Sequence, residues 1–377
     1  MTRDIFQTRL LVLQAAYSFI SQLSIAVLFP FLRQHFSFAQ ISLQSAIGYI
    51  IPIVLLPLLR GFNFRLSILF GIAASALRAG YVPYVDSPHE LYLYAVISGL
   101  QVIFFWIPYE ILYFHGHDAK IHGRQSAAYF AIFSGASIVM PVLSGFIADH
   151  FGFRILFGIG SGLMLIPFLF AFQIPKEYIR ITLADSLRHL KGVMALFVFD
   201  GLFWSIAPGL VALSLLNFTQ TAVQFGVVNS FVALGALFVS LFAARQSDRL
   251  QNRGMVIYPV SIFSAILLIV LGRQQSLYIF TIIFLVFTSL RTIAQPINNA
   301  LPMDLRHDHA KLYMGRQFLL SIGRVLGFGL TWLSVLTFGL FPMYVAYAAG
   351  YLLYTLVVRL VLRAPSHTVE SLPSVAQ

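Results

Sequence analysis

The sequence predicts an all-α membrane protein of twelve transmembrane helices, arranged as two similar six-helix bundles. Hydrophobic residues form 59% and charged residues 10% of the 377-residue chain, whereas soluble domains carry roughly 45–50% apolar and about 25% charged residues. The charges are bunched between long apolar runs, as expected of segments that cross hydrocarbon. A short motif also recurs at corresponding places in the two halves of the chain.

Twelve apolar runs have the length of a membrane-crossing helix, roughly 17 to 25 residues. The first is too long for the core of a signal peptide and has no cleavage pattern after it, so we expect it to be retained. Transmembrane β-strands are not expected, because runs such as 155–172 lack strict alternation. The expected spans are 10–31, 41–59, 66–83, 91–114, 127–148, 155–172, 193–215, 223–243, 255–271, 277–299, 317–338 and 341–362.

The longest loop divides the spans into six and six. We expect an N-terminal bundle over residues 1–172, a cytoplasmic linker over 173–192, a C-terminal bundle over 193–363 and a flexible tail over 364–377. Within the linker, Leu183, Leu187 and Leu190 recur at helical spacing. This spacing predicts a short helix at the membrane surface.

Lys and Arg are distributed unevenly between the two sides of the membrane. Most of the 24 lie in loops on the side of both termini, and only Arg33, Arg154 and Arg273 lie in the loops opposite. The positive-inside rule therefore predicts cytoplasmic termini, and we expect the membrane to be the plasma (inner) membrane. This bias, with attraction to anionic lipid, accounts for the net charge of +11, so no nucleic-acid partner is expected.

The motif Gly-Arg-Gln stands at the predicted cytoplasmic start of the fifth span and again at that of the eleventh. It occupies residues 123–125 and 315–317, which gives Arg124 and Arg316 corresponding positions. The preceding residues are also similar, HDAKIH in one half and HDHAKLYM in the other. A duplicated six-helix unit explains this echo, and chance recurrence of a tripeptide is the alternative.

Two further segments are similar to motifs of the major facilitator superfamily, and the likeness covers nearly all of the chain. GFIADHFGFR, residues 145–154, resembles the turn that closes the fifth span of many members. ARQSDRLQNRG, residues 244–254, resembles the cytoplasmic loop signature between the eighth and ninth spans. The equivalent loop of the first half, LRGFNFR at residues 59–65, lacks the aspartate of that signature.

The resemblance implies a secondary transporter whose midplane cavity opens to either side of the membrane in turn. Residues of both motifs, and the arginines of the repeated Gly-Arg-Gln motif, are then gating elements. They form contacts between helices in one arrangement of the transporter and lose them in the other. Solvated turns that only fix the topology are the alternative. The expected gating residues are Gly145, Asp149, Arg154, Asp248, Arg249, Arg253, Arg124 and Arg316.

Charged residues inside the spans are the candidates for the transport chemistry, because a charge at membrane depth costs about 2.5 to 3.5 kcal/mol on insertion scales. At 1.5 Å per residue, Asp200, Arg291 and Arg324 each fall about 10 Å from the cytoplasmic end of their spans. The resemblance places the seventh and tenth spans at the cavity and the eleventh beside the seventh. We therefore expect Asp200 and Arg291 to reach the cavity, with Arg324 close enough to pair with Asp200.

Two roles fit these three charges. Asp200 takes up and releases a proton while an arginine holds an acidic part of the substrate, or the three form a permanent salt-bridged set. The surplus of positive charge favours an anionic substrate. Glu110 lies about 6 Å from the inner end of its span and either couples to protons or extends to the cytoplasmic surface. Arg78, nearer the outer end of a peripheral span, is expected to anchor the interface.

Three aromatic residues, Tyr17, Trp106 and Trp204, are candidates for the cavity wall, because each combines an apolar face with a polar donor. Packing against lipid is the alternative. The chain contains no cysteine, and no nucleotide-binding loop is present, so ATP is not the direct energy source. We expect no metal site and no cofactor.

The sequence therefore predicts a monomeric, proton-coupled transporter of a small anionic molecule in the lipid bilayer. The segment ASIVMPVLSG, residues 136–145, is similar to the fifth span of proton-coupled antiporters and favours export. A passive facilitator of an organic anion is the first alternative, and a lipid scramblase is the second. An enzyme is not expected, because the spans contain no histidine and no catalytic constellation.

Overall fold

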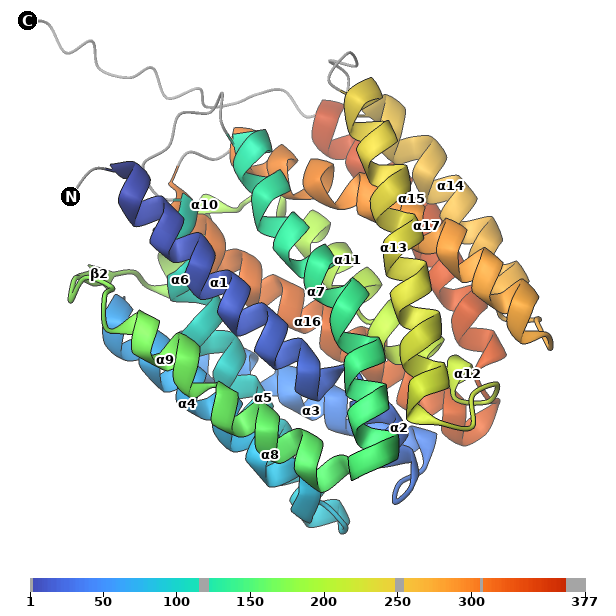
Figure 1. Ribbon diagram of the computed structural model, residues 1–377. Helices are drawn as coiled ribbons and strands as arrows, with labels where there is room; N and C mark the ends of the chain where they lie inside the picture. Colours follow the sequence, from blue (N-terminus) through green and yellow to red (C-terminus); the bar gives the residue numbers. More distant parts are fainter. Residues whose placement is uncertain (1–2, 115–121, 248–253, 306–307, 364–377) are drawn as a thin grey trace, which may run out of the picture.

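The structure of the chain, a computed structural model, describes residues 3–114, 122–247, 254–305 and 308–363. These residues form a bundle of closely packed helices (Figure 1). Among them, eleven helical segments have the length and hydropathy to cross a membrane, and a twelfth, Val256–Leu271, is apolar but shorter. The predicted all-α class is confirmed, and each of the twelve expected spans corresponds to one of these segments.

Six spans form the N-terminal half. The first is broken into two helices, and the fourth contains a π-helical segment just before Pro108. The elements are α1 (Arg3–Ile25), α2 (Leu28–Arg33), α3 (Phe38–Leu55), a 3₁₀ turn (Leu56–Leu58), β1 (Gly61–Asn63), α4 (Phe64–Tyr81), a 3₁₀ turn (Val82–Tyr84), α5 (Pro88–Gln101), the π-helical segment (Val102–Trp106), α6 (Ile107–Phe114), α7 (His122–Phe151), α8 (Phe153–Leu163) and α9 (Leu165–Ala171).

Six spans form the C-terminal half, and the seventh span of the chain contains a second π-helical segment, around Pro208. Such segments are frequent at functional sites; Trp106 is the last residue of the first segment, and Trp204 lies two residues before the second. The elements are β2 (Tyr178–Arg180) and α10 (Leu183–His189) in the linker, then α11 (Met194–Trp204), the π-helical segment (Ile206–Val211), α12 (Ala212–Leu215), α13 (Ala222–Ser247), α14 (Gly254–Leu271), α15 (Leu277–Leu305), α16 (His309–Thr337) and α17 (Phe341–Arg363).

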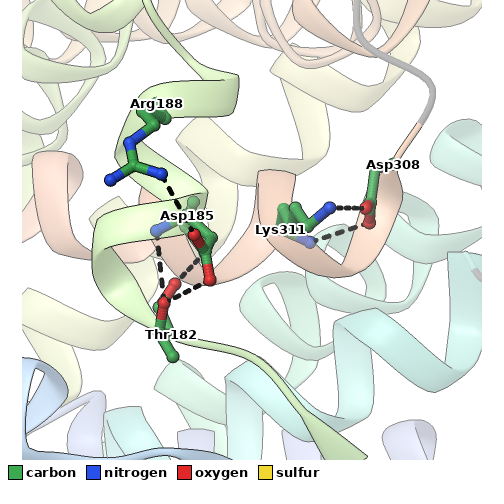
Figure 2. Close-up of polar contacts among 6 residues, drawn as sticks. Thr182, Asp185, Arg188, Asp308 and Lys311 are labelled. Atoms are coloured by element: carbon green, nitrogen blue, oxygen red, sulfur yellow. Dashed lines mark hydrogen bonds and ion pairs between the residues drawn. The ribbon is translucent and has the colours of Figure 1, made fainter.

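Helix α16 begins eight residues before the expected start of the eleventh span at 317. Asp308 caps it, because one carboxylate oxygen accepts a hydrogen bond from the backbone N–H of Lys311 at 3.1 Å while the other lies 2.8 Å from the Lys311 ammonium (Figure 2). The basic residues Lys311 and Arg316 end the apolar run without ending the helix. Helix α15 likewise continues past the expected end of its span, to Leu305.

The linker is fastened to both halves. β1 and β2 form an antiparallel ribbon in which Phe62 lies opposite Ile179, and Gly61, with φ of 150°, leaves no Cβ to collide with the Ile179 carbonyl. The sequence did not predict this ribbon, because its strands have only three residues each. The predicted linker helix is confirmed as α10. Thr182 caps it through the backbone N–H of Asp185, and α10 packs against α16 (Figure 2).

The two halves meet along two pairs of helices. Helix α7 lies beside α13 (Figure 1), and α3 packs along α16. Helix α1 begins, and α17 ends, on the upper side of the bundle in Figure 1, which we name the terminus side. Large apolar side chains such as Phe238 and Leu360 are exposed on the outer faces, as expected where helices face lipid. Buried polar and charged side chains therefore concentrate where helices meet.

Candidate functional site

Arg324 lies in the middle of α16, where the two halves meet. Its side chain is only 7% exposed. The guanidinium carbon lies 4.8 Å from the ring centre of Tyr49 on α3 and 4.6 Å from that of Trp204 at the end of α11. Tyr49 belongs to the N-terminal half and Trp204 to the C-terminal half. We call Arg324, Tyr49 and Trp204 the Arg324 site.

No carboxylate neutralises Arg324 within the described part of the chain. None of the ion pairs found there includes it, and its Nε has no hydrogen-bond partner. A cation–π contact stabilises a guanidinium by about 0.5 to 2 kcal/mol, which is less than the cost of burying an unpaired charge. The planar N–H donors of arginine match carboxylate and phosphate groups. The site is thus suited to an anionic group.

Asp200 does not form the expected ion pair with Arg324. Among the described residues, no pair within 4.0 Å joins Asp200 to Arg324 or to Arg291. The reason is depth. Arg324 contacts Trp204, which lies about 6 Å beyond Asp200 along α11. Arg324 is therefore not on the level of Asp200: it lies about 22 Å from the terminus-side start of α16, whereas Asp200 lies about 9 Å from that of α11.

Asp200 instead lines a small pocket of about 30 Å³ among helices α11, α14, α15 and α17, all of the C-terminal half. Arg291 contributes to the same wall, so the expected proximity of Asp200 and Arg291 is present. The guanidinium carbon of Arg291 also lies 5.9 Å from the ring centre of Trp204. Arg291 therefore borders both this pocket and the Arg324 site.

A buried ion pair joins the two halves on the terminus side. Nη1 of Arg316 on α16 lies 3.3 Å from both carboxylate oxygens of Glu110 on α6. The phenol of Tyr129 on α7 donates a hydrogen bond to the same carboxylate at 3.0 Å. The side chains of Arg316 and Glu110 are 12% and 9% exposed. Glu110 therefore does not extend to the surface, which was one of the two expectations for it.

A second contact joins the halves on the side opposite the termini. Asp149, near the end of α7, accepts hydrogen bonds from the backbone N–H groups of Ala222 at 3.1 Å and Val223 at 2.9 Å. These residues begin α13, where N–H groups lack partners within the helix and the helix dipole favours an anion. One turn earlier, Gly145 lies so close to α13 that a Cβ would collide with the Ala222 carbonyl.

Tyr17 and Trp106 lie in the packed interior of the N-terminal half. Tyr17 is fully buried, hydrogen-bonds the Ser75 hydroxyl at 2.7 Å and stacks on Phe105 with ring centres 3.5 Å apart. Trp106 packs edge-on against both rings. Of the three aromatic residues proposed for a cavity wall, Trp204 is the most exposed, with 36% of the residue accessible, whereas Trp106 is partly buried and Tyr17 fully buried.

The other predicted residues are not brought into these clusters. Arg78 is buried and donates to the Ser21 hydroxyl at 3.3 Å, so it does not anchor the membrane interface as expected. Arg154 is exposed at the start of α8. Three gating candidates, Asp248, Arg249 and Arg253, lie outside the described residues. For a fourth, Arg124, the structure describes the backbone but not the side chain.

Two residues of these clusters, Tyr49 and Tyr129, are absent from the sequence-based candidates. Nothing in the sequence separates them from the other tyrosines, of which the chain has 17. A signal exists only for Tyr129, which follows Arg124 by five residues on a helix that carries the Gly-Arg-Gln echo.

Residues 10–328 match the Major Facilitator Superfamily, and no curated protein sequence matches the chain. Among solved structures, the human organic anion transporter MFSD10 (TETRAN) is similar with a TM-score of 0.68 and 12% identity, over 93% of this chain and 99% of that one. A D-xylose-proton symporter is similar with a TM-score of 0.66 and 16% identity, over 93% and 96%.

At these identities the two structures show a shared fold over almost the whole length of each chain. The family match spans both halves and the linker, and the apolar helices show a multi-pass membrane protein. The resemblance drawn from the sequence motifs is confirmed, and an enzyme is excluded in favour of a transporter. The chain belongs to the Major Facilitator Superfamily of membrane transporters.

Proposed function

We propose that this transporter moves a small organic anion, coupled to protons, by alternating access, as a monomer with both termini in the cytoplasm of a plasma (inner) membrane. The observation that carries the proposal is the buried guanidinium of Arg324, which lies between aromatic rings of opposite halves and has no carboxylate partner among the described residues. The similar human protein is described as an organic anion transporter, and the other as a proton symporter.

An anion bound at the Arg324 site neutralises the arginine at the boundary between the halves. Tyr49 and Trp204 offer apolar ring faces to the rest of the molecule, and each carries one polar donor. Because the rings come from different halves, a bound anion interacts with both and favours arrangements in which they lie close. This is the differential binding that a transport cycle requires of its substrate.

Coupling to protons is assigned to Asp200. When its carboxylate is ionised it partly offsets the charge of Arg291, which borders the same pocket and also the Arg324 site. When Asp200 is protonated, the positive charge beside Trp204 increases and an anion binds more tightly. By linkage the anion then favours the protonated form by the same factor. The proposal therefore favours movement of anion and proton in the same direction, against the export that the segment 136–145 favours.

Alternating access requires contacts that close one side while the other opens. We assign the ion pair of Glu110 and Arg316 to the cytoplasmic gate, because it crosses between the halves on the terminus side. The cap that Asp149 provides for α13 is assigned to the outer gate.

The test starts with thermal stability of the purified chain in the presence of carboxylates, organic sulfonates and organic phosphates, with neutral sugars for comparison. We expect anions alone to raise the melting temperature and R324Q to abolish the effect. The matched control is R273Q, because Arg273 also lies over an aromatic ring, at 5.1 Å from Phe341, but on the exposed surface. Stabilisation by neutral sugars, or by anions in R324Q, contradicts the proposal.

Coupling is tested with an anion that passes this screen, as flux into liposomes with and without a pH gradient. Uphill accumulation should follow the gradient and disappear in D200N, and its orientation relative to the proton gradient reports the direction of transport. Flux that is independent of pH and survives in D200N identifies a passive facilitator. Movement of labelled lipid between leaflets without a gradient identifies a scramblase.

A further inference from the structure

The pocket that contains Asp200 is polar and lies within a single half of the transporter. Beside Asp200 and Arg291 it is lined by Ser261 and Ser264 of α14 and by Asn298 of α15. Two of its buried atoms, Ser264 Oγ and Asn298 Oδ1, have no hydrogen-bond partner among the described residues. Leaving a buried polar atom unsatisfied costs about 1 to 3 kcal/mol, so two such atoms in one pocket indicate an occupant that can hydrogen-bond.

Ser264 departs from the usual behaviour of serine in a helix. Ser289 and Ser321 hydrogen-bond the carbonyl oxygen four residues earlier on their own helices, at 2.8 Å in both cases, as is common for serine in apolar helices. Ser264 makes no such bond and is 0% exposed. Its hydroxyl, on a residue of the pocket wall, is therefore left without a partner among the described residues.

The occupant is identified by the size and chemistry of the pocket. A volume of about 30 Å³ accommodates one or two water molecules, each of which needs two to four polar partners. The carboxylate of Asp200 and Oδ1 of Asn298 only accept hydrogen bonds, and water donates two. A metal cation is disfavoured, because the guanidinium of Arg291 lies in the same wall.

The pocket extends toward the terminus side. Ile257 in its wall lies about 5 Å from the start of α14, and Asn298 about 10 Å from the end of α15. At the other end, Arg291 lies in the middle of α15 and borders the Arg324 site through Trp204. The pocket wall thus reaches from Ile257, about one turn inside the terminus-side start of α14, to Asp200 and Arg291, and all of its residues belong to the C-terminal half.

We infer that this pocket is a water-filled proton port, through which Asp200 exchanges protons with the terminus side along a route separate from that of the anion. The inference rests on the proposed proton coupling through Asp200. A proton moves from a hydronium in the pocket to a carboxylate oxygen of Asp200. One O–H bond of the hydronium breaks, one O–H bond of the carboxylic acid forms, and a neutral water remains between Ser264 and Asn298.

The charged and titratable groups around Asp200 fit this role. Arg291 on α15 and the phenols of Tyr351 and Tyr354 on α17 share its pocket, whereas α14 contributes no titratable group to it. Arg316 and Arg324 on α16 act on Asp200 from a greater distance. Among the described residues no second carboxylate lines the pocket, so Asp200 is the carboxylate to which a water there can pass a proton.

The test follows the carboxylic C=O infrared band of the full chain in lipid after a rapid drop in pH, and identifies the band of Asp200 by its loss in D200N. We expect S264A and N298L to slow the rise of this band about tenfold or more, equivalent to ~1.4 kcal/mol of barrier. Both variants should keep the stabilisation by anions that depends on Arg324. S264A adds no bulk and N298L preserves the side-chain size, so at least one is expected to fold.

The matched control is S230A. Ser230 is a buried serine on α13 whose hydroxyl also has no partner within the described part of the chain, but it does not line the pocket. Rates in S264A and N298L equal to that of S230A overturn the proton port and leave the proposed function standing. If D200N removes no band and changes no coupling, proton coupling through Asp200 fails, and the port fails with it.

Discussion

Arg316 and Glu110 hold α16 and α6 together across the two halves, with one guanidinium nitrogen 3.3 Å from each carboxylate oxygen. Beside them, Phe114 of α6 stacks on Tyr313 of α16 with ring centres 5.2 Å apart. The pair must separate if the halves part on the terminus side. Its Coulomb energy is offset by the cost of burying two charges, so the pair can reversibly break, whereas removal of one partner leaves an uncompensated buried charge.

The first prediction concerns this pair. E110A should lower the free energy of unfolding by about 3 to 5 kcal/mol, because it leaves Arg316 buried without a carboxylate. The double variant E110A/R316A should lose less than the sum of the two single variants, since residues in one ion pair couple by about 0.5 to 3 kcal/mol. Denaturation of the purified protein measures all three.

Y129F provides the graded control for this cycle. It removes the hydroxyl that donates to the Glu110 carboxylate and leaves the ion pair in place, so it should cost about 1.5 to 3 kcal/mol, less than E110A. Strict additivity of E110A and R316A would show that the two side chains are not energetically coupled.

The second prediction concerns the opposite side. D149A removes the carboxylate that caps α13, and loss of a cap costs typically about 1 kcal/mol, or a factor of about five in an opening equilibrium. The natural chain has no cysteine, so a single S45C reports access cleanly. Ser45 precedes Tyr49 by one turn on the same face of α3. The rate at which a membrane-impermeant maleimide labels the cysteine of S45C should increase about fivefold when D149A is added.

The control for that experiment is D185A, which removes another carboxylate beside a helix N-terminus, on the exposed helix α10. It should leave the labelling rate unchanged. Equal acceleration by D149A and D185A would refute a specific role of Asp149 in closing the bundle.

The third prediction compares two glycines. A Cβ on Gly145 would collide with the backbone of Ala222 and Val223, whereas a Cβ on Gly158 of α8 meets nothing within 4 Å. G145A should therefore force α7 and α13 apart, lower the melting temperature and reduce transport. G158A should be neutral or stabilise the helix by up to about 1 kcal/mol, the difference in propensity between the two residues. Similar melting temperatures for both variants would contradict this close packing of the halves.

The spans were predictable from the sequence because each needs only a long apolar run, a property that survives uncertainty about packing. Their ends on the terminus side were not. The basic residues before and within α16 resemble a loop, but a capped helix can carry Lys311 and Arg316 beyond the hydrocarbon core. The shift in the start of α16 moved the inferred depth of Arg324 by about 12 Å, and the expected pairing with Asp200 failed with it.

The composition of the clusters was only partly predictable. Glu110 and Arg316 were each identified, the first as a charge in a span and the second by the repeated Gly-Arg-Gln, but no pattern joins residues on the fourth and eleventh spans. Tyr49 was not identified because its function in the Arg324 site depends on the crossing of α3 and α16. A shift of one residue along a helix turns the side-chain direction by about 100° around the helix axis and so changes the neighbouring helix that it contacts. Hydropathy does not determine this angle when all faces of the helix are apolar.

The last prediction concerns pH and the cap of α16. Burial acts to raise the pKa of Asp308, but the hydrogen bonds from the ammonium and the backbone N–H of Lys311 outweigh it and hold that pKa below its ordinary value. The folded state therefore favours the ionised carboxylate. Its contribution to stability is fully present above the ordinary pKa of an aspartate, near 4, and is lost as the pH falls through the lowered value.

D308N and D308A separate the charge from the cap. Asparagine is as good a helix cap as aspartate, whereas alanine costs about 0.5 to 2 kcal/mol, so only D308A should lose the capping contribution at pH 7. Both variants lack the titrating carboxylate, and both should show a shallower fall in melting temperature between about pH 5 and pH 2 than the natural protein. An acid-induced fall as steep in D308N as in the natural chain would mean that other carboxylates control it, and that the bond between Asp308 and Lys311 contributes nothing to the stability of α16.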